Sequence, residues 1–273
     1  MLSTKGLNLT MLSIPCVKSQ QLHDPQSTKL IAKFENPTQF QEDCDAGYDQ
    51  FLSRNVVVRH RYFSHFLEQK QDLYEQLLIL GVGLDTKPDT LPCLKNKAVY
   101  GCDLAVADIQ NIYQATGVHT QTKLVACDLE NGMDQQFLTR LQAQGFSLTK
   151  PTLVLWEGGT FYLSPEAVVH DLSFLNQQLN LVGLLVDYMS SAVFNPPRHE
   201  KARRQLDLVA KIGCPWKSFF TPVEIKQLDH KLGFTEINVT AHGKIEQRVF
   251  GKVQLDEDIM YLSAAFKSVA GTK

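Results

Sequence analysis

Short apolar runs alternate with segments of helical periodicity through the middle of the chain. Runs of this kind, bounded by polar or glycine positions, are typical of strands buried on both faces of a sheet. Because strands that alternate with helices need crossover connections, the pattern predicts a doubly wound, mainly parallel sheet. The predicted strands are residues 77–80, 98–102, 123–127, 152–156 and 181–187, and the helices between them are residues 105–116, 133–144 and 165–179.

The N-terminal quarter of the chain follows a different pattern. Residues 1–37 have no clear periodicity, and we expect an arm or an irregular lid there. From residue 38 to residue 70 apolar side chains recur at helical intervals. We therefore divide the chain into an N-terminal arm and helical lid (1–70) and a sheet domain (71–273).

The segment after the fifth strand contains a helix with clear end signals. Thr221 can cap it, Pro222 suits its first position, Glu224 completes a capping box and Gly233 can end it. The strand-like runs 235–240, 244–250 and 259–266 predict a hairpin-like, antiparallel ending on the sheet.

A long connection precedes that helix, at residues 189–220, with a helical middle at 200–212. A connection of this length is typical of a lid or a substrate-facing insertion.

Composition narrows the class of protein. The chain has 273 residues, 44% of them hydrophobic, and a formal net charge of −2, which argues against binding to duplex nucleic acid. No apolar run approaches the roughly 18 residues of a membrane span, and no Cys-x-x-Cys pair points to a metal. We expect a cytoplasmic protein with no nucleic-acid, membrane or metal partner, and its oligomeric state stays open.

Two glycines, Gly81 and Gly83, directly follow the first predicted strand. Parallel sheets bind ligands at the carboxyl ends of their strands, where glycine lets the backbone come close to the ligand. Thr86 stands where a dinucleotide fingerprint needs its third glycine, and Asp85 would repel a diphosphate. A cofactor with a positive centre and an amino-acid end fits better. A tight turn with no ligand is the alternative.

Acidic residues follow the next three strands. They are Asp103, Asp128 and Glu157, and Asp103 stands 20 residues after Gly83, the spacing at which a carboxylate receives a ribose hydroxyl in such folds. Each of these residues alone could instead cap a helix. The series is harder to explain by capping.

These segments together resemble the leucine carboxyl methyltransferase family, over roughly residues 40–250. The resemblance is carried by Val58-Arg59-His-Arg61, Leu80-Gly-Val-Gly-Leu-Asp-Thr-Lys87, Val99-Tyr-Gly-Cys-Asp103, Ala126-Cys-Asp128-Leu129, Trp156-Glu157-Gly-Gly-Thr-Phe-Tyr162-Leu-Ser-Pro-Glu166 and the late segment 219–234.

The resemblance implies a class I, Rossmann-like methyltransferase fold with an N-terminal helical extension, and S-adenosylmethionine as cofactor. Arg59 would pair with the methionine carboxylate, and Glu157 would lie near the amino group. The remaining cofactor residues would be Gly81 and Gly83 beneath the cofactor, Asp103 and Leu104 at the ribose, and Asp128 and Leu129 at the adenine.

The chain departs from the family pattern at three places. Lys87 replaces an arginine, Gly101 replaces an acidic residue, and residues 88–90 replace an aromatic-arginine pair. Lysine cannot form the bidentate fork of arginine, so these changes bear on the substrate more than on the cofactor.

The function expected from this resemblance is O-methylation of a carboxylate, on a small molecule or a protein C-terminus. A carboxylate is ionised at neutral pH and needs no general base. The predicted substrate residues are three cations that could hold it, Arg61, Lys87 and Arg198, and two tyrosines at the pocket edge, Tyr162 and Tyr188. A hydroxyl acceptor would need a base, for which Asp187, His199 and Glu157 are candidates.

Two other functions stay open. One is a non-catalytic S-adenosylmethionine-binding or interaction protein on the same fold. The other is a nicotinamide oxidoreductase, against which Thr86 counts. No catalytic residue is assigned.

Overall fold

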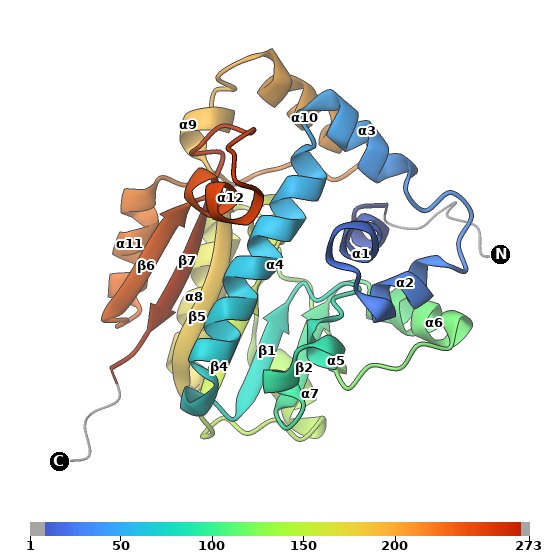
Figure 1. Ribbon diagram of the computed structural model, residues 1–273. Coiled ribbons are helices and arrows are strands. Elements are labelled where there is room, and N and C mark those ends of the chain that lie inside the picture. Colours follow the sequence, from blue (N-terminus) through green and yellow to red (C-terminus); the bar gives the residue numbers. More distant parts are fainter. Residues whose placement is uncertain (1–8, 269–273) are drawn as a thin grey trace.

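One seven-stranded sheet organises residues 9–268, which the computed structural model describes (Figure 1). The strand order is β3-β2-β1-β4-β5-β7-β6; the first five are parallel, and β7 runs antiparallel to both of its neighbours. This confirms the predicted doubly wound, mainly parallel sheet with an antiparallel C-terminal part. The strands are β1 Gln76–Leu80, β2 Ala98–Asp103, β3 Lys123–Ala126, β4 Thr152–Trp156, β5 Leu181–Met189, β6 Glu236–Ala241 and β7 Met260–Phe266.

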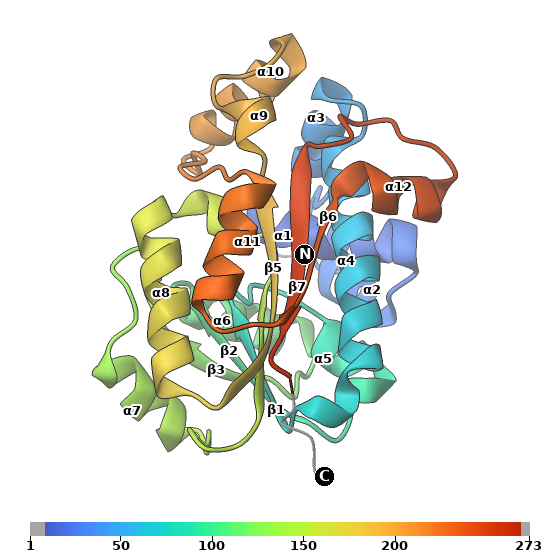
Figure 2. The same cartoon turned by 90° about the vertical axis from the view of Figure 1, so that its left-hand side faces the viewer.

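Helices cover both faces of the sheet and its upper edge (Figures 1 and 2). In the view of Figure 2, α7, α8 and α11 lie on one side of the sheet, and α4 and α12 lie on the other. The helices are α1 Leu9–Leu22, α2 Pro25–Ile31, α3 Gln39–Gly47, α4 Phe51–Gln69, α5 Lys87–Thr90, α6 Val106–Thr116, α7 Gln135–Ala143, α8 Pro165–Gln178, α9 Ser191–Phe194, α10 Glu200–Lys211, α11 Pro222–Lys231 and α12 His242–Phe250.

The continuous apolar run of β1 follows from this burial on two sides. Leu77 and Ile79 join the core under α4, whereas Leu78 and Leu80 join the core under α7 and α8. Successive side chains of a strand point to opposite faces, so a strand covered on both faces must be apolar at every position. The same pattern in β4 and β5 places these three strands at the centre of the sheet.

Two sequence-based predictions about secondary structure were wrong. Residues 244–250 belong to helix α12, whose buried His242, Ile245 and Glu246 have helical spacing. Residues 9–22 and 25–31 are helices, and no irregular lid is seen there; residues 1–8 lie outside the described part. Helix α1 is buried on nearly all sides, which removes the periodicity that would have revealed it. The division of the chain at residue 70 stays a prediction.

The capping box at the start of α11 is confirmed. Thr221 accepts a hydrogen bond from the Glu224 backbone N–H at 3.2 Å, and the Glu224 carboxylate accepts from the Thr221 backbone N–H at 2.7 Å. The helix ends before Gly233, which has the left-handed φ of +84°.

Replacing Asp229 on α11 by asparagine is expected to stabilise the protein at pH 7.5. This carboxyl is fully buried, accepts one hydrogen bond from Ser263 at 2.6 Å, and burial raises its pKa to about 6. Between about pH 4 and pH 6 the native state therefore binds the proton better than the unfolded chain, so the free energy of unfolding falls as the pH rises through this window. In urea unfolding, D229N should exceed the wild type by about 1–2 kcal/mol at pH 7.5 and by much less at pH 4.5.

The matched control is Asp207→Asn, because Asp207 is exposed on α10. It should leave the free energy of unfolding nearly unchanged at both pH values. A loss of stability in D229N that is the same at pH 4.5 and pH 7.5 would contradict the prediction.

Candidate functional site

A cavity of about 560 Å³ lies at the carboxyl ends of the central strands, where the strand order reverses between β1 and β4. This is the point at which open parallel sheets bind ligands. Its wall contains every residue predicted to contact the cofactor, namely Arg59, Gly81, Gly83, Asp103, Leu104, Asp128, Leu129 and Glu157. The structure thus brings the predicted set together in one place, and their role in binding stays a prediction.

The glycine turn after β1 forms one side of the cavity. Gly81 and Gly83 have positive φ values of +60° and +49°, which side chains other than glycine rarely adopt. A Cβ on Gly81 would meet no atom within 4 Å, whereas one on Gly83 would lie 3.5 Å from Met11 of α1. The backbone at Gly81 therefore borders open space, and α1 covers the far end of the turn.

The Asp103 carboxylate links the ends of β1 and β2. It accepts hydrogen bonds from the backbone N–H of Gly83 and of Ala105, both at 2.9 Å. Helix α6 has no side-chain cap at its first turn, so Asp103 is not a helix cap. Each carboxylate oxygen can accept a second hydrogen bond, which leaves Asp103 able to receive a ligand hydroxyl. The neighbouring Leu104 keeps 73% of its surface exposed.

Asp128 has the same arrangement at the end of β3. One of its oxygens accepts from the Glu130 backbone N–H at 3.0 Å, and the other accepts from Asn131 Nδ2 at 2.7 Å. Both carboxylates are held in place by backbone N–H groups of adjacent loops, with acceptor capacity to spare.

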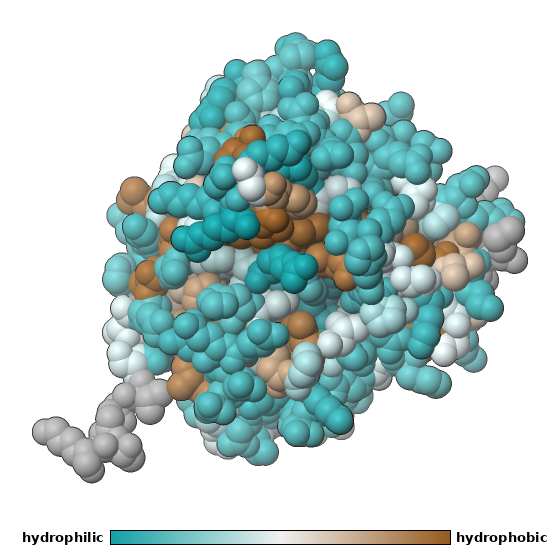
Figure 3. Space-filling view, in the orientation of Figure 1, coloured by the Kyte–Doolittle hydropathy of each residue, from teal (hydrophilic) through white to brown (hydrophobic). Residues whose placement is uncertain are grey.

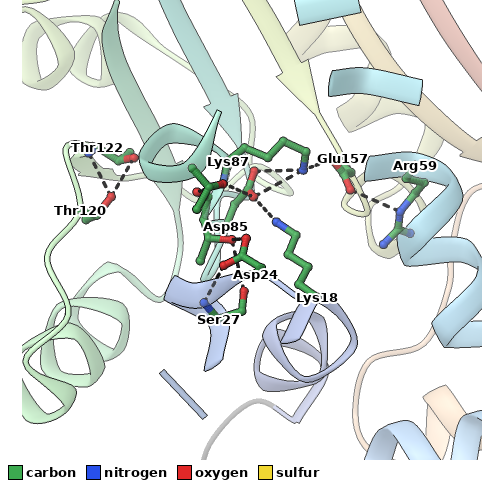
Figure 4. A network of polar contacts seen from close by, with 11 residues as sticks. Lys18, Asp24, Ser27, Arg59, Asp85, Lys87, Thr120, Thr122 and Glu157 are labelled. Carbon is green, nitrogen blue, oxygen red and sulfur yellow. Dashed lines mark hydrogen bonds and ion pairs between the residues drawn. The ribbon is translucent and has the colours of Figure 1, made fainter. Parts of the chain in front are cut away.

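A buried ion network joins α1 to the strand ends (Figure 4). Lys18 Nζ lies 2.5 Å from Asp85 Oδ1, and Lys87 Nζ lies 2.5 Å from Glu157 Oε2 and 3.4 Å from Asp85. Burial alone would raise the pKa of Asp85, but the two ammonium groups outweigh it and hold that pKa below its usual range. Burial alone would likewise lower the pKa of Lys87, but the two carboxylates raise it. Lys87 therefore keeps its charge, already balanced by its neighbours.

Helix α1 and helix α2 are thus attached directly to the glycine turn. Besides the Lys18–Asp85 pair, Thr86 donates a hydrogen bond to Asp24 at 2.8 Å. Lys18 lies on the cavity wall and was missed by the sequence reasoning. No local pattern in residues 9–22 marks it, because its partner lies 67 residues away.

Arg59 reaches the cavity from helix α4. It is 4% exposed, its Nη1 lies 3.4 Å from Asp187, and its Nε lies 3.8 Å from Glu157. This Nε donates no hydrogen bond to any described residue. A Cβ on Gly158, which has a φ of +75°, would lie 3.1 Å from the guanidinium, so glycine makes room for it. The Arg59 side chain is therefore held in a buried position.

Asp187 pairs with the Arg59 guanidinium and holds it in position. Its Oδ1 accepts the Gly158 backbone N–H at 2.8 Å, and burial raises its pKa to about 6 although Arg59 opposes this shift. Asp187 is fully buried and absent from the cavity wall. It positions the guanidinium and cannot reach a substrate as a base.

Three predicted substrate residues lie away from the cavity, so the prediction that they line it was wrong. Arg61 follows Arg59 by two positions, about 200° around the helix, and is exposed. Tyr188 lies in the core under α11, its ring centroid 5.1 Å from that of Phe220. Arg198 forms an exposed ion pair with Asp258 at 2.7 Å.

His199 is likewise away from the cavity. It caps α10 and pairs with Asp256 at 2.7 Å. Lys87 and Tyr162 do line the cavity.

The cavity continues from the strand ends into a space beneath α3 and α10, which we call the lid-side compartment. None of the described side chains that form it is charged, and several are aromatic. Part of its wall comes from the connection 189–220, as expected for a substrate-facing insertion. Its residues are Phe40, Cys44, Phe51, Leu52, Asn55, Phe161, Tyr162, Met189, Gln205, Val209, Cys214 and Trp216.

Two further properties concern residues 9–268 alone. Within this range no group of three or more His, Cys, Asp or Glu side chains is arranged to hold a metal. No helix in the same range is long and apolar enough to cross a membrane. The face seen in Figure 3 is largely hydrophilic, with apolar side chains in small areas.

Known proteins share this fold. A Streptomyces avermitilis protein of the DUF574 family superposes with a TM-score of 0.66 at 15% identity, covering 92% of this chain and 100% of that one. A Thermobifida fusca protein, provisionally described as a methyltransferase, gives a TM-score of 0.61 at 14% identity, covering 89% and 93%. At these identities the likeness shows that the chain shares the fold of these two proteins.

Sequence comparison identifies the family. Residues 18–175 match the leucine carboxyl methyltransferase family, and the chain belongs to that family. A Mycobacterium marinum protein, provisionally described as an S-adenosyl-L-methionine-dependent methyltransferase, is 32% identical over 121 residues. That match covers 42% of this chain and 36% of the relative, so the chain matches about a third of the relative's length.

Proposed function

We propose that this chain is an O-methyltransferase that uses S-adenosylmethionine to methylate a carboxylate, on a small molecule or a protein C-terminus. The observation that carries the proposal is the composition of one cavity wall. A buried guanidinium, an open glycine turn and carboxylates at three successive strand ends face the same space.

The residues present suit this cofactor. The Nε of Arg59, which donates no hydrogen bond to any described residue, can donate to a carboxylate, and the free acceptor positions of Asp103 and Asp128 can receive hydroxyl and amino groups. The open backbone at Gly81 leaves room beside them. S-adenosylmethionine, when bound, supplies a methyl group on a positively charged sulfur. The chain's own residues align the acceptor and exclude water.

A carboxylate acceptor agrees with the chemistry of the lid-side compartment. Among residues 9–268, no histidine, aspartate or glutamate belongs to the compartment. The Tyr162 hydroxyl and the Cys44 thiol of the compartment stay protonated at neutral pH, because burial raises the pKa of each to about 12. An acceptor oxygen that lies in this compartment without a base beside it must be ionised before it binds, and a carboxylate meets that requirement.

A non-catalytic cofactor-binding protein is the second candidate. It is favoured by the ion pair between Lys87 and Glu157. Glu157 is the carboxylate expected near the methionine amino group, and Lys87 already pairs with it.

The test is methyl transfer from S-adenosylmethionine labelled in its methyl group to small carboxylic acids and to a peptide that ends in leucine. The expected product is a methyl ester, which releases labelled methanol in mild alkali. The rate should change less than threefold between pH 7 and pH 9, since no proton is removed from the acceptor. An alkali-stable product, or a rate that rises about tenfold per pH unit, would contradict the carboxylate assignment. Cofactor binding without transfer to any acceptor would favour the second candidate.

A further inference from the structure

The lid-side compartment presents aromatic rings from three separate elements. The centroid of the Trp216 ring lies 5.7 Å from that of Phe51 on α4 and 5.1 Å from that of Phe161 after β4. The first pair is inclined by 35° and the second by 64°, and all three rings line the cavity. Aromatic pairs of these kinds stabilise a bound ring beyond the area that it buries. An aliphatic ligand would be stabilised only by the apolar area that it buries.

Asn55 adds one requirement for a polar group on the ligand. It is 1% exposed, lines the cavity, and lies one helical turn before Arg59 on α4. Its Nδ2 donates to the Phe51 carbonyl at 2.9 Å, which fixes the orientation of the amide because that carbonyl can only accept. Its Oδ1 is buried and accepts no hydrogen bond from any described residue. A buried acceptor of this kind is costly unless a ligand donates to it.

The same compartment disfavours a polypeptide. Each residue of a bound peptide would bring one backbone donor and one backbone acceptor, and burying these groups without partners is unfavourable. The compartment offers few polar side chains, with Asn55 and Gln205 its buried amides. An ion pair at 3.2 Å between Lys217 and Glu130 also ties the loop that carries Trp216 to the loop after β3 at the edge of the cavity.

From these observations we propose that the acceptor is a small carboxylic acid with an aromatic ring and a hydroxyl donor. Its ring binds among Phe51, Phe161 and Trp216, and its hydroxyl donates to Asn55 Oδ1. This inference rests on the proposed methyltransferase function and narrows it to one class of substrate. It makes Trp216 and Asn55 specificity-determining residues for the acceptor, without a role in holding the cofactor.

The test measures binding to the full chain in saturating S-adenosylhomocysteine, by calorimetry and by tryptophan fluorescence. The ligands are 3-hydroxybenzoate, benzoate, hexanoate and an acetylated peptide ending in leucine. We expect 3-hydroxybenzoate to bind at least tenfold more tightly than hexanoate or the peptide. Only two tryptophans are present, and both line the cavity, but Trp216 alone belongs to the lid-side compartment. Most of the fluorescence change should therefore be lost in Trp216→Phe while calorimetry still detects binding.

Two variants separate the ring from the hydroxyl. Trp216→Ala should weaken both benzoates at least tenfold and hexanoate less than threefold. Asn55→Leu should reduce the affinity for 3-hydroxybenzoate to that for benzoate. Phe146→Ala is the control, because Phe146 is a buried aromatic in the core on the other face of the sheet; it should leave the affinities unchanged.

Tighter binding of hexanoate or the peptide, or an equal loss for all ligands in Trp216→Ala, would overturn the proposal. So would absence of binding by both benzoates while S-adenosylhomocysteine binds. Failure of the proposed function gives a different result, in which S-adenosylhomocysteine itself does not bind. Benzoates that still bind with the expected variant pattern would then support the ligand class of the compartment, and benzoates that do not bind would refute both proposals.

Discussion

Replacing Arg59 by glutamine is expected to weaken S-adenosylmethionine binding by about a hundredfold. The variant removes a buried cation of α4 that lies on the cavity wall and whose Nε donates no hydrogen bond to any described residue. A hydrogen bond to a charged group contributes about 1.5–3 kcal/mol, and each 1.4 kcal/mol corresponds to about tenfold in affinity. The dissociation constant, measured by calorimetry at pH 7.5, checks this expectation.

The matched control is Arg61→Gln, which changes the same residue type two positions along the same helix. Because Arg61 is exposed and absent from the cavity wall, its replacement should alter the affinity less than twofold. The fold should tolerate Arg59→Gln, since Asp187 has a raised pKa of about 6 and can take up a proton when its cation is lost. Equal effects of the two substitutions would contradict the assignment of Arg59.

Replacing Asp103 by alanine is expected to weaken S-adenosylmethionine binding by tenfold to a hundredfold. It removes a charged acceptor for a ribose hydroxyl, with the same range of about 1.5–3 kcal/mol. It also removes the acceptor that holds the Gly83 backbone N–H. Asp103→Asn should have a smaller effect, because its amide oxygen can still accept from Gly83 while the charge is lost.

Asp108 offers the control for this pair of variants. It lies five residues further on, exposed in the first turn of α6 and away from the cavity. Asp108→Ala should leave the dissociation constant unchanged. An unchanged affinity in Asp103→Ala, in a protein whose thermal unfolding matches the wild type, would refute the role of Asp103.

The sheet could be predicted from the sequence because each of its strands carries a local signal. Leu77–Leu80 and Thr152–Trp156 are apolar at nearly every position, as strands covered on both faces must be. Helices α1 and α12 were missed for opposite reasons. Burial on nearly all sides hid the period of α1, whereas Ile245 and Val249 made α12 look like a strand, although they lie four residues apart on one helical face.

The residues of the candidate site also divide into those with a local signal in the sequence and those without one. Gly81, Asp103 and Glu157 could be found because each ends or directly follows a strand, and the carboxyl ends of parallel strands meet at one edge of the sheet. Lys18 and Trp216 could not be found. They reach the cavity from α1 and from the connection 189–220, and they are placed by contacts between segments far apart in the chain. Sequence proximity likewise misplaced Tyr188, whose side chain points to the face of β5 opposite to that of the neighbouring Asp187.

The central claim is that this cavity binds S-adenosylmethionine, and calorimetry of the unmodified chain tests it most directly. Titration with S-adenosylmethionine, S-adenosylhomocysteine and NAD in separate experiments should give saturable binding of the first two at one site per chain, and none with NAD. Absence of heat with both sulfur compounds, or saturable binding of NAD in their place, would contradict the account.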